Sequence, residues 1–425
     1  MHSSHQPSGA LALVATLFLC PAAFGQTFQG LGPIAGGSSS QSQGVSADGS
    51  VVIGLGQVGG LNRPFRWTPG GGAVNLGVLA GGEIGAAQAS EVSDDGAVVV
   101  GTSAADGSIA SKAFRWTQTG GMVNLGTLAG GTSSVANGVS GDGQVVVGYS
   151  TSSDGQRAYR WTATDGMQDL GTLSGFTASL ALGADADGSV VVGYAQVTGS
   201  ARALRWVDGV LEDLGLVNGY ASSYGYACSV DGSVVVGRVF DIGLGGQMCR
   251  WTQAGGMQEI GRLDGATTAF AYGVSGDGSV VVGMSQFTGA GNRRATMWTE
   301  ASGVRDLNVY LPTIGIDLTG WVLTDATDVS PDGTRIVGYG VHGGVTEAWI
   351  ATLPPALCPA DLGATGGVPG GDGVLNNNDF VVFIDYFFAQ NPLADRGSTG
   401  GVPGADAQWN NNDFVVFIDQ FFAGC

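Results

Sequence analysis

The stretch that decides the fold runs from Gly138 to Gly171. It reads Gly-Val-Ser-Gly-Asp-Gly at 138–143, Val-Val-Val-Gly at 145–148, Ala-Tyr-Arg-Trp at 158–161 and Met-Gln-Asp-Leu-Gly at 167–171. Gly, Asp or Ser separates each short apolar or alternating run from the next, which is typical of short strands joined by tight turns. The stretch therefore predicts a unit of four strands.

This unit recurs along most of the chain, at spacings of about 45 residues. Its Trp recurs as Trp67, Trp116, Trp161, Trp206, Trp251, Trp298 and Trp349. Its turn Asp recurs as Asp48, Asp95, Asp142, Asp187, Asp231, Asp277 and Asp332. Repeats of this length with several strands each indicate propeller blades, whereas helical repeats would need a 3.6-residue periodicity that is absent here. We expect an all-β, seven-bladed β-propeller over residues 26–355.

The ends of the repeat array predict how the ring closes. The seventh unit stops at Leu353-Pro354 without a fourth strand, while residues 28–37 imitate residues 123–131, which form the fourth strand and crossing of another unit. We therefore expect the start of the mature chain to complete the last blade. Such closure removes the exposed strand edges of an open array.

Two charged positions recur in the units and could serve in ligand binding or in the structure. We favour a structural role. The Arg of the third strand recurs as Arg66, Arg115, Arg160, Arg205 and Arg250. We expect each to pair with the turn Asp of a neighbouring unit, rather than to form a ring of anion ligands. The turn aspartates follow the spacing of the turns, so we expect them to be structural as well.

The composition limits location and partners. The chain has 425 residues and a net charge of −19. Residues 1–25 resemble a secretory signal peptide, and no other stretch qualifies as a membrane span, so we expect a secreted, monomeric protein at or near the cell surface. Nucleic acid is disfavoured as a partner because phosphate binding needs clustered Lys and Arg. The mature chain keeps one histidine, His342, which leaves little room for His-based catalysis.

Four cysteines remain after signal cleavage: Cys228, Cys249, Cys358 and Cys425. An even count in an exported chain indicates disulfides. Cys228 and Cys249 both replace core-facing residues of the fifth unit, so we predict a disulfide between them, with two buried free thiols as the alternative.

Residues 356–425 form a second region with an internal duplication. Each copy has an acidic, Gly-rich loop before an apolar run, and the Asn clusters before these runs favour helices over strands. The loops carry oxygen ligands at spacings close to those of an EF-hand loop, which predicts two Ca²⁺ sites. The expected ligands are Asp361, Asp372, Val374 and Asp379 in the first copy, and Asp395, Asp406, Gln408 and Asp413 in the second. The alternative is a capped helix pair that binds nothing.

Both regions resemble known families. Residues 28–353 resemble the HAF-type extracellular repeat family of bacterial secreted proteins, through Gly-Val-Ser-x-Asp-Gly, Val-Val-Val-Gly and Ala-Phe-Arg-Trp. The namesake His is replaced by Arg or Lys here, so no His-based role carries over. The C-terminal region looks like a dockerin of the type that begins Cys358-Pro-Ala-Asp and ends Gly-Cys425. The resemblance implies a Cys358–Cys425 bridge and an anchoring receptor in an extracellular assembly.

Three functions remain open. The leading one is a non-catalytic binding or scaffold protein that presents variable loops to a carbohydrate or protein ligand. Aromatic residues expected in or beside these loops could stack on such a ligand, or could simply pack at the loop bases: Tyr149, Tyr194, Phe240, Phe287 and Tyr339. The second is an extracellular polysaccharide-active enzyme, a glycosidase or lyase, for which Glu83, Glu212 and Asp241 are unranked candidates. The third is a structural role in a surface layer.

Overall fold

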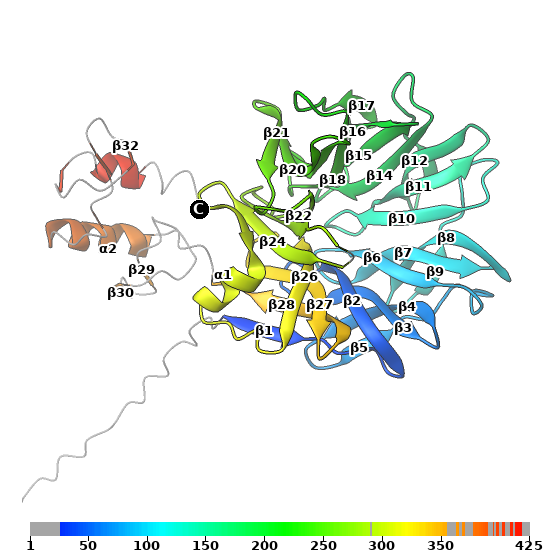
Figure 1. The fold of residues 1–425 in the computed structure, drawn as a ribbon, viewed down its shortest axis with the longest axis horizontal. Helices are drawn as coiled ribbons and strands as arrows, with labels where there is room; N and C mark the ends of the chain where they lie inside the picture. Colours follow the sequence, from blue (N-terminus) through cyan, green and yellow to red (C-terminus); the bar gives the residue numbers. More distant parts are fainter. Residues whose placement is uncertain are drawn as a thin grey trace, which may run out of the picture.

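The computed structural model describes residues 26–289 and 291–354 and, beyond them, residues 363–364, 368–369, 377–389, 394, 397–398, 402–403, 409–410 and 413–418. Residues 26–354 form a seven-bladed β-propeller, in which seven four-stranded antiparallel sheets surround a common axis (Figure 1). The predicted fold of this region is confirmed.

The strands follow one order in every blade, from the innermost to the outermost. Blade one holds β2 (Gly37–Val45), β3 (Val52–Val58), β4 (Leu61–Thr68) and β5 (Gly72–Asn75). Blade two holds β6 (Ala87–Val92), β7 (Val98–Ala105), β8 (Ser108–Thr117) and β9 (Gly121–Asn124). Blade three holds β10 (Ser134–Val139), β11 (Val146–Ser152), β12 (Gly155–Thr162) and β13 (Gly166–Asp169). Blade four holds β14 (Ala178–Ala184), β15 (Val190–Val197), β16 (Ser200–Val207) and β17 (Val210–Asp213).

The remaining blades repeat this order with one change. Blade five holds β18 (Ser222–Cys228), β19 (Val234–Asp241), β20 (Gly245–Thr252) and β21 (Gly256–Gly261). Blade six holds β22 (Thr268–Val274), β23 (Val280–Gln286), β24 (Arg293–Thr299) and β25 (Gly303–Asp306). Blade seven holds β26 (Trp321–Val329), β27 (Arg335–His342) and β28 (Val345–Thr352), and its outer strand is β1 (Thr27–Gly30).

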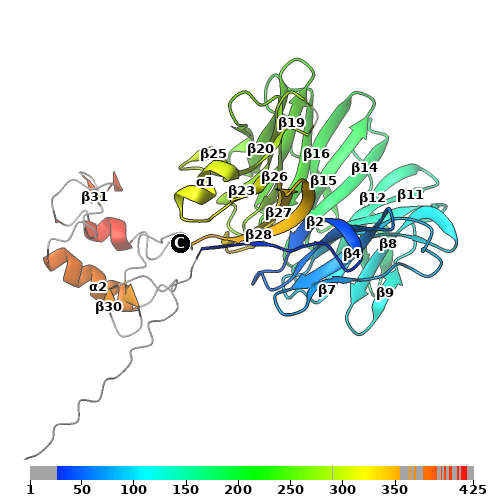
Figure 2. The ribbon, with the colours of Figure 1, turned by 60° about the horizontal axis from the view of Figure 1, so that its bottom comes forward.

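The first strand of the chain closes the ring, as the sequence predicts. β1 runs antiparallel to β28, with Phe28 opposite Ala351 and Gly30 opposite Trp349 (Figures 1 and 2). The Phe28 ring lies 5.0 Å from the Trp321 ring, in an edge-to-face arrangement. The two ends of the repeat array, which are distant in sequence, therefore share one sheet, and blade seven packs against blade one.

The Ser-x-Asp-Gly turns explain why the inner hairpins form at fixed places. In the first, Ser46 Oγ donates to Asp48 Oδ1 (2.8 Å) and accepts from the Val51 N–H (3.0 Å). Gly49 has a φ of 71°, which glycine adopts without strain. The carboxylate thus stabilises its own turn, which supports the structural reading of the seven turn aspartates.

The repeated arginines link neighbouring blades, but their partners differ from those we expected. Arg66, Arg115 and Arg160 donate to the carbonyl oxygens of Gly96, Gly143 and Gly188, each the glycine of the next blade's Asp-Gly turn. Arg205 and Arg250 repeat the arrangement with Gly232 and Gly278. The predicted partner of these arginines, the turn Asp of a neighbouring unit, was therefore wrong. The carbonyl, whose position the turn fixes, accepts the hydrogen bond, while the aspartate is occupied by its own turn.

One repeat position also shifts in the seventh blade. In blades one to six the repeated Trp lies opposite a strand-two valine, as Trp67 lies opposite Val52. Trp349 instead lies opposite Gly338, the register held by Phe65 in blade one, and Ala351 takes the place of the usual Trp. Aligning Trp349 with the other tryptophans was therefore wrong by two residues, which on a strand keeps the side chain on the same face.

The predicted disulfide of blade five is contradicted. Cys228 on β18 lies opposite Val235, and Cys249 on β20 lies opposite Gly237, so β19 separates the two cysteines. Strands two positions apart are about 9.5 Å apart, which exceeds the roughly 7 Å that a disulfide spans between Cα atoms. Both thiols are free. The two positions share a blade but not a neighbouring pair of strands.

The helices lie outside the repeat pattern. α1 (Leu307–Thr313) was not predicted; Asp306 caps it, and Leu307 and Leu311 are buried against the last two blades. In the C-terminal region, α2 (Asn377–Phe388) and residues 413–418 are helical, as the Asn clusters predicted. The short two-stranded pairs β29–β30 (Gly363–Ala364, Val368–Pro369) and β31–β32 (Gly397–Ser398, Val402–Pro403) complete the described part. Among the described residues, no helix is long and apolar enough to cross a membrane.

Candidate functional site: the central cavity

A cavity of about 540 Å³ lies where the innermost strands of the blades meet. Each of these seven strands has a β-bulge at the same place. A bulge inserts one residue and re-aims its side chain. The inserted residues all line the cavity: Gln43, Ser90, Asn137, Leu182, Tyr226, Tyr272 and Thr327. Seven equivalent positions thus carry six residue types, whereas the framework around them repeats.

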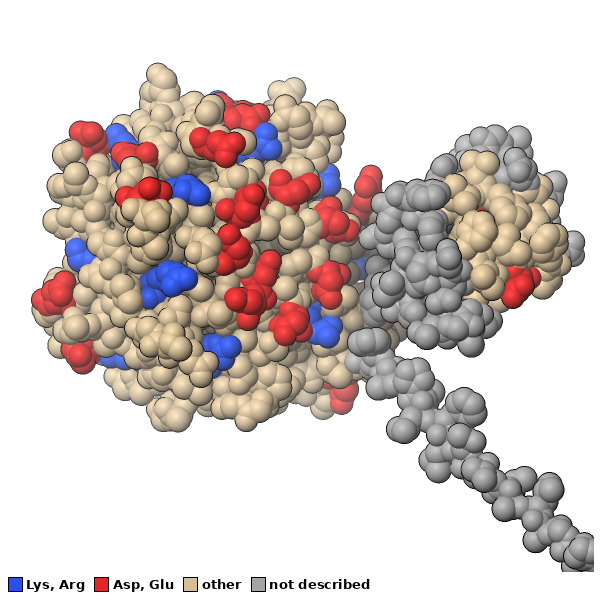
Figure 3. All heavy atoms as spheres, turned by 180° about the vertical axis from the view of Figure 1, so that it is seen from behind, with Lys and Arg blue, Asp and Glu red and all other residues tan. Residues whose placement is uncertain are grey.

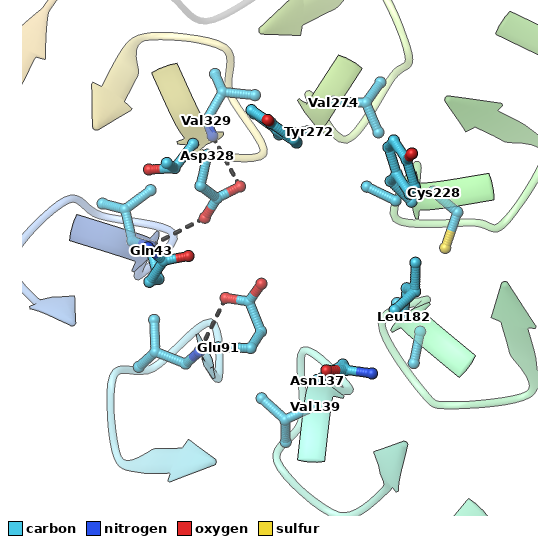
Figure 4. A pocket seen from close by; sticks show the side chains of 18 of the residues that line it. Gln43, Glu91, Asn137, Val139, Leu182, Cys228, Tyr272, Val274, Asp328 and Val329 are labelled. Atoms are coloured by element: carbon cyan, nitrogen blue, oxygen red, sulfur yellow. Dashed lines mark hydrogen bonds between the residues drawn. The ribbon is translucent and has the colours of Figure 1, made fainter. Parts of the chain in front are cut away.

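The residue after each bulge is small in five blades and acidic in two. Gly44, Gly138, Gly183, Ala227 and Gly273 occupy it in blades one, three, four, five and six. Glu91 and Asp328 occupy it in blades two and seven, and both carboxylates point into the cavity (Figure 4). Blade one lies between these two blades, so the glycine at position 44 separates the acids.

Backbone N–H groups hold the two carboxylates in place. Asp328 Oδ2 accepts from the Val45 N–H (2.9 Å) and Oδ1 accepts from the Val329 N–H (2.8 Å). Glu91 Oε1 accepts from the Val92 N–H (2.8 Å). Asp328 therefore links blade seven to blade one, and Glu91 lies against the same junction from blade two.

Burial, and to a lesser extent nearby negative charge, raises the pKa of both carboxyl groups. Burial raises the pKa of Asp328 to about 7. Burial, followed by the nearby charge of Asp328, raises the pKa of Glu91 well above its ordinary value. The described residues that line the cavity include Asp94 and Asp185 as further acids and no Lys, Arg or His. The pair consequently holds protons at pH values where exposed carboxyl groups are ionised.

Backbone hydrogen bonds between blades narrow the end of the cavity that lies at the Asp-Gly turns. The Ala47 N–H donates to the Asp94 carbonyl, and the Asp94 N–H donates to the Gly141 carbonyl, both at 2.9 Å. The same pattern continues to Gly276, whose N–H donates to the Pro331 carbonyl (2.8 Å). It cannot continue from Pro331 to blade one, because proline has no N–H.

The seven turn aspartates are exposed beside this end of the cavity. Figure 3 shows Asp and Glu side chains gathered on one face of the propeller, with fewer Lys and Arg among them. The fold thus places the repeated acids on one face, although each of them serves its own turn.

Aromatic side chains form the wall at the opposite end. We call Tyr194, Tyr224, Tyr226, Phe270 and Tyr272 the aromatic belt. Its rings are in contact across blades four to six, with centroids 5.0 Å apart for Tyr194 and Tyr224 and 5.6 Å apart for Phe270 and Tyr272. Tyr226, Phe270 and Tyr272 line the cavity directly. The cavity therefore has an acidic end and an aromatic end.

The predicted ligand-binding aromatics are only partly brought together. Tyr339 lines the cavity, and Tyr194 belongs to the aromatic belt. Tyr149 is half-buried on β11. Phe240 lies at the far end of β19, and Phe287 follows β23 outside the cavity. Four of the five lie within strands rather than in loops: Tyr149, Tyr194, Phe240 and Tyr339.

The acids named from the sequence do not line the cavity. Glu212 pairs with Arg205 (2.7 Å), Asp241 accepts from the Gly243 N–H (2.8 Å), and Glu83 is exposed. The sequence reasoning missed Glu91 and Asp328. The sequence does set these two residues apart, because each replaces the Gly of the repeated Gly-Val-Ser motif.

Most of the predicted calcium ligands lie outside the described residues, as do Cys358 and Cys425. This applies to Asp361, Asp372, Val374, Asp395, Asp406 and Gln408. Asp379 lies in the first turn of α2, and Asp413 is buried, with Oδ2 accepting from the Asn410 N–H (2.7 Å). Within the described ranges, no three His, Cys, Asp or Glu side chains come together as a metal would require.

Solved structures share the fold. The chain matches oligogalacturonate lyase from Vibrio parahaemolyticus with 11% identity and a TM-score of 0.52, over 77% of this chain and 93% of the other. An oligogalacturonate lyase in complex with manganese gives 12% identity and a TM-score of 0.51, with the same coverage of both chains. TolB from Acinetobacter baumannii gives 12% identity and a TM-score of 0.42, over 60% of this chain and 64% of the other. At these identities the likeness to the two lyases shows a β-propeller and nothing finer. No protein-family model and no curated protein matches the sequence.

Proposed function

We propose that this is a secreted, non-catalytic binding protein that takes a carbohydrate or protein ligand at the central cavity and is anchored through its C-terminal region. The observation that carries the proposal is the contrast between framework and cavity. Hydrogen-bonding Ser and Asp recur in the turns, whereas the bulge positions differ from blade to blade. A purely structural ring has no need for this variety. A cavity with a few polar groups and several aromatic rings is typical of ligand sites.

A binding assay on the mature chain, residues 26–425, tests this proposal. A panel of soluble polysaccharides, oligosaccharides and secreted proteins would be compared with the variants Asn137→Ala and Tyr272→Ala, which truncate two bulge residues. We expect one class of ligand to bind and both variants to weaken it about tenfold or more. Gln168→Ala, on an exposed outer strand, is the matched control. If both cavity variants bind the ligand as well as the unmodified protein does, the binding site lies outside the cavity.

The proposed anchor rests on the C-terminal region. The Phe383 ring stacks on the Phe417 ring at 3.9 Å, so the two duplicated apolar runs pack against each other as helices. The acidic loops before these helices carry the predicted Ca²⁺ ligands. We propose that Ca²⁺ orders the loops and that the ordered region binds an extracellular receptor.

Calcium titration of the intact mature chain tests the anchor. We expect Ca²⁺ at millimolar concentration or below to change the Trp409 fluorescence and to protect residues 356–425 from proteolysis. Asp372→Asn combined with Asp406→Asn should abolish both responses and leave propeller unfolding unchanged. Identical proteolysis in chelator and in excess Ca²⁺ would rule out the metal sites.

A second candidate function follows from the Glu91–Asp328 pair. Two carboxyl groups with raised pKa values in one cavity are the kind of groups that act as general acid and base on polysaccharides. The oligogalacturonate lyases of the same fold make a polysaccharide-active enzyme the alternative to test. Turnover of any polysaccharide that falls at least a hundredfold in both Glu91→Gln and Asp328→Asn would favour it over the binding protein.

A further inference from the structure

Arg238 is an arginine without an acidic partner in a protein of net charge −19. It follows the glycine of β19, at the position that Tyr149, Tyr194 and Tyr339 hold in three other blades. None of the five ion pairs among the described residues includes it. It also differs from the repeated arginines of the third strands, whose N–H groups donate to turn carbonyls.

Aromatic rings surround its guanidinium. The guanidinium carbon lies 4.3 Å from the centroid of the Phe270 ring, 4.8 Å from that of Tyr224 and 5.2 Å from that of Phe240. All four side chains are half-buried, so the cluster is only partly exposed to solvent. Arginine stacked on rings in this way keeps its planar edge available for hydrogen bonds.

Polar atoms around this cluster have unmet hydrogen-bonding capacity. Arg238 Nε is buried and has no hydrogen-bond partner, and the same is true of Thr268 Oγ1 and Gln247 Oε1. Thr268 Oγ1 and Arg238 Cδ both lie against Gly246, which places the two side chains together. Leaving a buried donor of a charged group unpaired costs more stability than a satisfied hydrogen bond gains. An arrangement of this kind is expected where a ligand supplies the partner.

The cluster lies at the aromatic end of the cavity. β19 leaves the Asp231-Gly232 turn and ends at the hairpin to β20, and Arg238 is nearer to that hairpin. Phe270, which contacts the guanidinium, also lines the cavity. Asp94 lines the other end of the cavity, beside the Asp-Gly turns, so Arg238 and the acidic face lie at opposite ends of the cavity.

We propose that Arg238 receives the carboxylate of an acidic saccharide, whose sugar ring lies against the aromatic belt. The planar guanidinium matches a carboxylate through two parallel hydrogen bonds, which a lysine cannot reproduce. The half-buried aromatic belt beside it provides apolar area for a sugar ring. This inference rests on the proposed function and narrows its ligand to a saccharide that bears carboxylate groups.

The overall negative charge restricts the ligand further. Repulsion from the acidic face acts over about 8 Å at physiological salt. A densely charged polymer would be repelled along its length, whereas a short saccharide has few carboxylates that the acidic face repels. We therefore expect short uronate oligosaccharides to bind better than long ones at low ionic strength.

Isothermal titration of the mature chain with a galacturonate trisaccharide and its full methyl ester tests the inference. The two probes share their rings and differ in charge. We expect the acid to bind about tenfold or more tightly than the ester, since one charge-assisted contact accounts for such a factor. Arg238→Met should reduce binding of the acid to the level of the ester and leave the ester unchanged. Arg238→Lys should retain part of the preference.

Arg115→Met is the matched control, because Arg115 donates to the Gly143 carbonyl in another blade. It should leave the preference for the acid intact. Thermal unfolding of each variant confirms that it is folded. Equal affinity for acid and ester, or a preference that survives Arg238→Met, overturns the inference while the proposed function stands. Failure of both probes overturns the inference, and the wider ligand panel then decides whether the proposed function survives.

Discussion

The Glu91 carboxylate lies against Gly44, the residue before Val45, whose N–H donates to the Asp328 carboxylate. A Cβ added at Gly44 would lie 2.5 Å from Glu91 Oε1, and the next residue, Val45, donates its N–H to Asp328. The absence of a side chain at position 44 therefore leaves room for the Glu91 carboxylate beside the backbone that holds Asp328.

Gly44→Ala should displace the Glu91 carboxylate from the Val92 N–H. We expect a loss of about 1–2 kcal/mol in the free energy of unfolding, because the added methyl overpacks a confined site. In the background of Glu91→Ala the same substitution should cost almost nothing, since the methyl then has room. Gly183→Ala, the equivalent position in a blade without an acid, is the control. Equal costs with and without Glu91 would contradict the placement of its carboxylate.

Because of the acid pair, the free energy of unfolding should also decrease as pH rises through the weakly acidic range. The folded-state pKa of Asp328, about 7, exceeds the unfolded value of 3.8, so between these pH values the folded protein holds a proton that the unfolded chain has lost. The free energy of unfolding should therefore fall as pH rises from about 4 to 7. Asp328→Asn should flatten this fall.

The turn aspartates act in the opposite direction. Hydrogen bonds from Ser93 and from the Ala97 N–H lower the pKa of Asp95 below 3.8, and Asp231 is similar. Their contribution is present above the unfolded pKa and is lost as pH falls below it. Urea unfolding at several pH values from 3 to 8 measures both effects. A stability that rises steadily from pH 4 to 7 would contradict the raised pKa of Asp328.

Ring closure should be sensitive to Gly30. A Cβ at this position would lie 2.5 Å from Glu347 Oε1 and 2.7 Å from Trp321 Cζ2. Gly30→Val should therefore separate β1 from β28 and lower the free energy of unfolding by about 2–3 kcal/mol. Gln29→Val, at the exposed neighbouring position, should change it by less than about 0.5 kcal/mol. Hydrogen exchange along β28 would show whether the seam opens.

The contacts between blades can be tested at Arg66. Its Nε and Nη2 donate to the Gly96 carbonyl, at 3.3 and 3.2 Å, rather than to Asp95. Arg66→Met should cost about 1–2 kcal/mol of unfolding free energy. In a double-mutant cycle with Asp95→Asn, the coupling should stay below about 0.5 kcal/mol. A larger coupling would show that the aspartate, not the carbonyl, is the partner.

The sequence by itself determined the number of blades, the strands within each blade and the closure by the N-terminal strand. It could do so because each of these depends on local turn chemistry and on a pattern that repeats. Gly49 and its equivalents fix the inner hairpins, and the missing fourth strand of the seventh unit matches the extra one at residues 28–37.

Only the tertiary structure decided which residues meet. Cys228 and Cys249 share a blade, yet an intervening strand separates them. Their spacing in the sequence does not reveal how far apart they lie in the sheet. Glu91 and Asp328 are more than 200 residues apart and lie on either side of blade one, because β1 pairs with β28 and brings the ends of the array together. Arg238 likewise lies against Tyr224 of its own blade and Phe270 of the next blade. The repeated sequence unit specifies the ring of blades. Closure of the ring then brings residues that differ between the repeats, such as Glu91 and Asp328, around one central axis.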